Sequence, residues 1–237
     1  MARSFAICSY WQAREETPHE CAGRTFRFLQ SIRPIDPCFS DWYEFATRKR
    51  PAIKFEVNEE NLERLFAAGV NRRDTDHTII HELGFQIGLA NSSERGSLIL
   101  RIHCGCYSKH VPNSCILNRT LGDGFPESLL NVPTLLHLLM LMIERFDAHH
   151  AVVSCHELNE GIEYPTGLPR FGWLTYFSNE FRKLPSFNPP TRVVPVEGKG
   201  NIVILTDERF DSDRPDHLGI AKDAVAALRK AKVIPKP

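Results

Sequence analysis

The chain has 237 residues, of which 42% are apolar and 24% are charged, a composition typical of globular proteins. A chain of this length can bury a large core without disulfides, which argues against a mainly disordered protein. Lysine and arginine together number 29, as do aspartate and glutamate, so the formal net charge is zero. Without an excess of positive charge, no general attraction to nucleic acid or to anionic lipid is expected.

Two further features favour a cytoplasmic protein without a membrane segment. The first residues show no apolar stretch followed by a small-residue cleavage site, and residues 135–143 are far shorter than the roughly 18 apolar residues that span a bilayer. The cysteines are odd in number and form no C-x-x-C pair, so we expect free thiols. They are Cys8, Cys21, Cys38, Cys104, Cys106, Cys115 and Cys155.

The first part of the chain contains a strand pattern and two helix patterns. Residues 5–10 form an aliphatic and aromatic run that predicts a strand. Thr17-Pro18-His19-Glu20 has the form of a capping box and predicts the start of a helix, which proline 34 ends. Residues 34–51 carry three prolines around an aromatic pair, so we expect an irregular segment packed against the core. A short amphipathic helix is predicted over residues 58–69.

The middle of the chain predicts an antiparallel meander followed by a buried helix. Residues 85–89 and 98–102 alternate between apolar and polar side chains and predict a hairpin, to which residues 114–118 add a third strand. Residues 135–146 are apolar nearly all round, so we expect a helix buried between the sheet and another layer.

The last part of the chain adds more strands and a final helix. Strands are predicted over residues 151–155, 172–177, 192–196 and 201–206, with Gly198-Lys199-Gly200 closing a hairpin and Pro195 at a sheet edge. Residues 218–228 predict a helix. Because helices and hairpins come in blocks, we expect an α+β fold with a mainly antiparallel sheet and about four helices packed on it, in one domain spanning residues 1–237.

Cysteine and histidine residues gather between positions 103 and 115. They are His103, Cys104, Cys106, His110 and Cys115. Thiolates and imidazoles are the ligands that zinc prefers, but the spacing matches no finger or ribbon. On an alternating strand Cys104 and Cys106 continue the apolar face, which is typical of small core residues. We therefore expect no metal, cofactor or catalytic residue, and keep a metal- or thiol-dependent enzyme built on residues 103–115 as the alternative.

Acidic residues gather in two segments. Residues 207–216 surround an expected exposed Phe210 with two arginines and five acids, namely Asp207, Glu208, Asp211, Asp213 and Asp216. Residues 56–63 carry four acids and no base, namely Glu56, Glu59, Glu60 and Glu63. Both segments could face a basic partner. The alternative for both is a solvated segment near a helix N-terminus, where the helix dipole favours acids, and this alternative is favoured for residues 56–63.

Several motifs follow one another in an order that resembles a known family. The motifs are Trp11 with Arg14, Ile35-Asp36-Pro37, Trp42-Tyr43, Phe146-Asp147, Phe171-Gly172-Trp173-Leu174-Thr175-Tyr176, and the late glycine-containing hairpin. Over about residues 7–228 the chain resembles the immunity protein 52 family of bacterial polymorphic toxin systems. The family usually has Trp-Gly where this chain has Trp11-Gln12.

The resemblance implies an antidote without enzymatic activity that binds a cognate toxin in the cytoplasm. Toxins paired with this family are typically nucleases of restriction-endonuclease fold, often delivered by a type VI secretion system. Such a nuclease has a basic, DNA-facing surface, which the acidic segments of this chain could cover. A scaffold protein in secretion is a third hypothesis.

Overall fold

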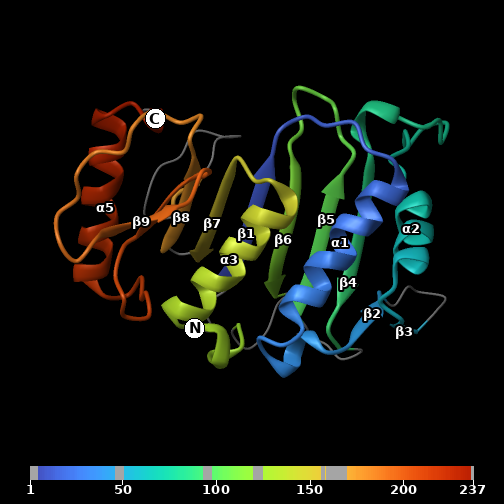
Figure 1. The fold of residues 1–237 in the computed structure, drawn as a ribbon, viewed down its shortest axis with the longest axis horizontal. Helices are drawn as coiled ribbons and strands as arrows, with labels where there is room; N and C mark the ends of the chain where they lie inside the picture. Colours follow the sequence, from blue (N-terminus) through green and yellow to red (C-terminus); the bar gives the residue numbers. More distant parts are fainter. Residues whose placement is uncertain are drawn as a thin grey trace.

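In the described part of the chain, ten strands form a sheet in the order β3-β2-β4-β5-β6-β1-β7-β8-β10-β9, and every neighbouring pair is antiparallel (Figure 1). The strands are β1 (Phe5–Trp11), β2 (Trp42–Glu44), β3 (Ile53–Phe55), β4 (Phe85–Ala90), β5 (Leu98–Cys104), β6 (Asn113–Arg119), β7 (His150–Cys155), β8 (Leu174–Ser178), β9 (Arg192–Val196) and β10 (Gly200–Ile204). This computed structural model describes residues 5–45, 51–92, 98–119, 125–155, 158 and 170–235.

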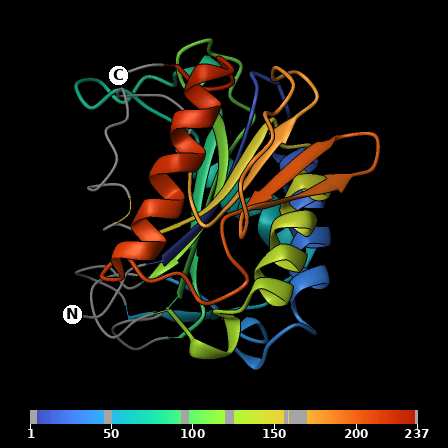
Figure 2. The same cartoon turned by 90° about the vertical axis from the view of Figure 1, so that its left-hand side faces the viewer.

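Four helices pack on the sheet within the described ranges. They are α1 (Pro18–Ile32), α2 (Glu59–Ala68), α3 (Val132–Phe146) and α5 (Pro215–Lys230). Helices α1, α2 and α3 lie on one face, and α5 lies on the opposite face (Figure 2). This arrangement confirms the predicted α+β fold with a mainly antiparallel sheet and about four helices. None of the described helices has both the length and the apolar character needed to cross a membrane.

Side-chain caps begin three of the four helices. The capping box of α1 forms as predicted: the Glu20 amide donates to Thr17 Oγ1, and the Thr17 amide donates to Glu20 Oε2 over 2.8 Å. Asn58 caps α2 and Asn131 caps α3 through their side-chain oxygens. These local hydrogen bonds explain why the helix starts are readable from the sequence.

The predicted meander is formed by β4, β5 and β6. Ile102 of β5 pairs with Ile87 on one side and with Cys115 on the other. Cys104 and Cys106 are 1% and 0% exposed, which confirms that they are core residues. The turns expected at residues 91–96 and 122–124 lie largely or wholly outside the described residues.

Two predictions about the helix-covered face are wrong. Residues 34–51 were expected to be irregular, but residues 42–44 form β2, which pairs with β4. A strand of three residues is too short to show a period, and one of its two partners, β4, lies about 45 residues away. Among the described residues no second layer covers helix α3, since His137 and Glu144 are exposed and Met140 is half-buried.

The C-terminal strands follow the prediction closely. β9 is an edge strand that contains Pro195, and the β9–β10 hairpin turns at Gly198 with φ +69°. β8 begins at Leu174, two residues later than expected, and both Trp173 and Tyr176 are buried. A Cβ on Gly172 would lie 2.2 Å from the carbonyl oxygen of Val153, so this position requires glycine.

Candidate functional site

The acidic loop, residues 207–216, connects the end of β10 to the first turn of α5. Arg192 Nη2 lies 2.6 Å from Asp207 Oδ1. Arg214 makes two ion pairs of 2.6 Å, one with Glu208 and one with Asp216. Hydrogen bonds from these arginines hold the pKa of Asp207, Glu208 and Asp216 below their usual range. The carboxylates are therefore ionised and exposed but already partly neutralised within the chain.

Phe210 is buried, which contradicts the expectation that it is exposed. Its side chain is 0% exposed and stacks on His217, with the ring centroids 5.4 Å apart. The Asp211 amide donates to His217 Nδ1 over 2.9 Å and so holds the loop over the start of α5. A phenylalanine among charged residues looks exposed in sequence, but here the loop folds back onto α5. Phe210 is therefore not a surface anchor.

The second acidic segment lies elsewhere on the molecule. Glu56, Glu59 and Glu60 are exposed, while Glu63 is half-buried and pairs with His19 over 2.8 Å. These residues belong to α2 and the turn before it, at the end of the sheet opposite α5 (Figure 1). The two acidic segments therefore do not form one continuous surface.

The cysteine- and histidine-rich segment does not converge on a site. Cys104 and Cys115 are buried, and burial raises the pKa of both thiols, so they stay protonated. His103 lies on the other face of β5 from Cys104 and contacts the carbonyl oxygen of Leu83 over 2.6 Å. The geometry of these residues gives the enzyme alternative no support.

A different group of potential metal ligands is found beside this segment. Oxygen of Glu16 and the sulfurs of Cys21 and Cys104 lie within 4.8 Å of one another, all buried. The Glu16 carboxylate is already held by Arg24, 2.8 Å away, and by Arg14, 3.2 Å away. Two guanidinium groups repel a cation here, and burial raises the pKa of the Cys104 thiol. The group is therefore better described as a buried ion-pair cluster that holds α1 in position.

A cleft of about 430 Å³ opens where β1 and β8 end, and we name it the strand-end cleft. Its walls come from the chain after β1, the end of α3, the end of β8 and the turn of the β9–β10 hairpin. The lining residues are Trp11, Gln12, Ala13, Arg14, Asp147, Ala148, His149, Tyr176, Ser178, Asn179, Glu180, Gly198 and Lys199.

Hydrogen bonds and ion pairs join the walls of the cleft. Lys199 Nζ donates to Asp147 Oδ1 over 2.9 Å, and this bond lowers the pKa of Asp147. Gln12 Nε2 donates to Glu180 Oε2 over 2.5 Å, and His149 Nδ1 lies 3.2 Å from the same oxygen. Each carboxylate is therefore ordered by a donor from a different segment of the chain.

Stacked side chains fix the inner wall of the cleft. The rings of Trp11 and Phe146 stack with their centroids 4.9 Å apart, and the Arg14 guanidinium lies 5.9 Å from the centre of the Trp11 ring. Arg14 Nη2 also donates to the carbonyl oxygen of Phe146. Asp147 then ends α3 in the left-handed conformation, with φ 54° and ψ 52°. These contacts set the direction in which Asp147 leaves the helix.

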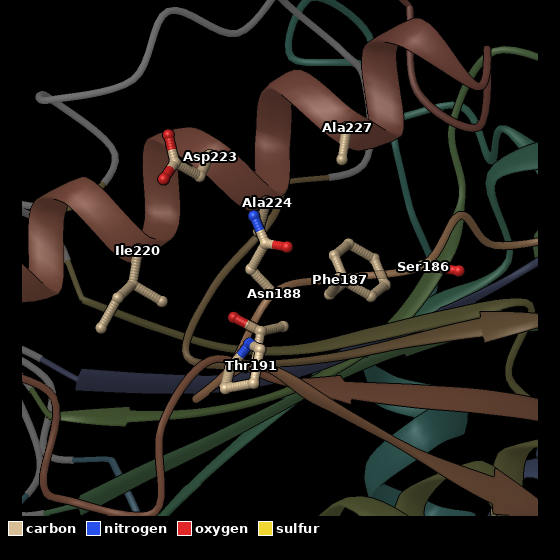
Figure 3. Close-up of a pocket in the computed structure, with 9 residues that line it drawn as sticks. Ser186, Phe187, Asn188, Thr191, Ile220, Asp223, Ala224 and Ala227 are labelled. Atoms are coloured by element: carbon tan, nitrogen blue, oxygen red, sulfur yellow. The ribbon is translucent and has the colours of Figure 1, made fainter.

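A smaller pocket of about 80 Å³ lies between α5 and residues 186–191. Figure 3 shows Asn188 and Thr191 beneath Ile220 and Ala224 of the helix. The space is sufficient for a few water molecules only. We therefore take the strand-end cleft and the acidic loop as the candidate sites.

Comparison with known proteins decides the family. The family model for Immunity protein 52 matches residues 4–236. The chain belongs to the immunity protein 52 family. A search of curated proteins found no match. Among solved structures, the chain is similar in fold to the Pseudomonas aeruginosa T6SS protein PA0821, with a TM-score of 0.55 and 11% identity, covering 95% of this chain and 73% of that chain.

Four of the segments that resemble the immunity protein 52 family in sequence meet at the strand-end cleft. Trp11 with Arg14, Asp147, Tyr176 and the glycine of the late hairpin all line it. These residues are recognisable as motifs in the sequence, but the sequence does not assign them to one site. The signal was present in the order of the motifs, and only the sheet topology shows that they converge.

Proposed function

We propose that this member of the immunity protein 52 family binds and neutralises a cognate bacterial toxin in the cytoplasm, without catalysing a reaction. The observation that carries the proposal is the family match over residues 4–236. We also propose that residues 1–237 form one immunity domain. Buried apolar residues from Phe5 to Ile234 belong to one packed cluster, which supports this part of the proposal.

The toxin we propose is a nuclease of restriction-endonuclease fold delivered by a type VI secretion system. The resemblance of the motif order to the family supports the nuclease. The name of the similar Pseudomonas aeruginosa T6SS protein supports the secretion route. Direct binding of nucleic acid or membrane is not part of the proposal, since the chain carries no net positive charge.

The acidic loop is proposed as a surface that attracts the toxin. Asp207, Glu208, Asp213 and Asp216 are exposed, and five acids against two arginines leave the loop net negative. A nuclease presents lysine and arginine to phosphates, so charge complementarity speeds its approach to such a surface. Glu56, Glu59, Glu60 and Glu63 around α2 are a second candidate. Phe210 is left out because its ring is buried.

A titration of toxin activity tests the proposed function. The protein encoded by the neighbouring gene is purified and its nuclease activity is measured with rising amounts of this chain. We expect activity to end at about one chain per toxin, because inhibition by binding is stoichiometric. Inhibition by far less than one equivalent would indicate a catalytic antidote, and no inhibition with no complex would overturn the proposal.

A further inference from the structure

The strand-end cleft presents its two carboxylates to solvent and keeps its basic side chains behind them. The side chains of Asp147 and Glu180 are 68% and 64% exposed. The side chains of Lys199, Arg14 and His149 are 37%, 30% and 29% exposed. A partner that approaches the cleft therefore meets the two carboxylates first.

Each of these carboxylates has one oxygen free to accept a hydrogen bond. Lys199 binds Oδ1 of Asp147, and both Gln12 and His149 contact Oε2 of Glu180. Within the described ranges nothing donates to Asp147 Oδ2 or to Glu180 Oε1. The bonded oxygens hold both groups in place, so the free oxygens are oriented before any partner arrives.

Trp11 lies in the inner wall of the cleft and is 3% exposed. Its indole Nε1–H is enclosed by the protein and has no acceptor among the described residues. A partner in the cleft therefore meets the carboxylates at the rim rather than this donor.

We propose that the strand-end cleft receives a loop of the cognate toxin whose arginine or lysine side chain binds Asp147 and Glu180. This inference rests on the proposed function and names the part of the toxin that the chain recognises. Guanidinium and ammonium groups donate in several directions, and an arginine seated in a concave site commonly contributes strongly to a protein interface. A nuclease carries such side chains for its contacts with phosphates.

The cleft and the acidic loop lie at opposite ends of the C-terminal strands, so they can be tested separately. Gly200 pairs with Ser178 at the cleft end of β10. Ile204 pairs with Arg192 at the other end, where Arg192 binds Asp207 of the acidic loop. Changes in the cleft therefore leave the ion pairs of the loop in place.

Binding of purified, catalytically inactive toxin to charge variants tests the inference. We expect Asp147→Asn with Glu180→Gln to weaken affinity at least tenfold. Lys199→Met removes both a positive charge from the cleft and the bond that orients Asp147, two effects that oppose each other, so it is expected to change affinity less than the double variant does. Glu144→Gln and Asp223→Asn, which remove exposed carboxylates outside the cleft, are expected to bind like the parent. Melting temperatures should stay close, since exposed ion pairs contribute little to stability.

The results separate this inference from the proposed function. If the parent binds and the double variant binds within twofold of it, the cleft is not the contact and the inference fails while the proposed function stands. If Lys199→Met weakens binding tenfold and the double variant does not, the occupant is anionic and the inference also fails. If the parent itself does not bind, the proposed function fails.

Discussion

Lys199, in the turn of the β9–β10 hairpin, donates to Asp147 at the end of α3, with Nζ 2.9 Å from Oδ1. The two residues are 52 positions apart, and their contact closes one side of the strand-end cleft. Since the Asp147 side chain is 68% exposed, the pair orients the carboxylate more than it stabilises the fold. The hairpin and the helix end thus act together in shaping this surface.

Neutralising the acidic loop should slow association with the toxin. We expect Asp211→Asn, Asp213→Asn and Asp216→Asn together to lower the association rate about tenfold at low salt, because electrostatic steering is reduced. Added salt should shrink the difference. Stopped-flow or surface-binding kinetics at two salt concentrations measure it. If the association rate at low salt is unchanged, the acidic loop does not attract the toxin. Residues 56–63 are then the next candidate surface.

Two buried cysteines should respond differently to serine. The Cys115 thiol is 0% exposed and has no hydrogen-bond partner among the described residues, so Cys115→Ser should destabilise by roughly 1–3 kcal/mol. The Cys106 thiol donates to the carbonyl oxygen of Val111 over 3.2 Å, and a hydroxyl can donate there too. Cys106→Ser should therefore cost less, below about 1 kcal/mol. Urea unfolding measures the free energy of unfolding of both variants. Equal losses of stability would contradict the stated difference in hydrogen bonding between the Cys106 and Cys115 thiols.

Trp173 should matter for stability before it matters for binding. It is 1% exposed, its ring lies 6.1 Å from that of Phe5, and its Nε1 donates to the carbonyl oxygen of Thr206 over 2.8 Å. Trp173→Ala should cost about 3–5 kcal/mol, and Trp173→Phe less because a phenyl ring still fills most of the site, although the hydrogen bond to Thr206 is lost. The melting temperature and the toxin affinity of each Trp173 variant are compared with those of the parent. Lost affinity with unchanged melting would assign Trp173 to the interface.

His150 should make stability depend on pH. It is 1% exposed among the rings of Tyr10, Phe177 and Phe181, and burial lowers its pKa to about 3. In the unfolded chain its pKa is about 6.5. Between these values only the unfolded state binds the proton, so stability falls as pH falls, by up to about 1.4 kcal/mol per pH unit.

Variants separate the contribution of His150 from other pH effects. His150→Phe keeps an aromatic ring in place and should flatten the loss of stability between about pH 6.5 and 3. His137→Gln changes an exposed histidine of α3 and should leave the slope unchanged. Urea unfolding at several pH values measures both. The same slope in His150→Phe and in the parent would show that other groups cause the pH dependence.

Local patterns in the sequence were enough to predict most elements of the fold. The capping box of Thr17 and Glu20 joins residues three positions apart, so its hydrogen bonds are readable without the tertiary structure. The alternation in residues 98–104 likewise placed Cys104 in the core. Short β2 was missed because a three-residue strand has no period and one of its two partners, β4, lies far along the chain.

Only the tertiary structure decided what the surface looks like. The sequence shows five acids in the acidic loop, but not that Arg192 pairs with Asp207 or that Phe210 turns inward onto His217. The strand-end cleft is made from four separate segments. Such contacts depend on long-range strand pairing, whereas sequence patterns report interactions between residues only a few positions apart.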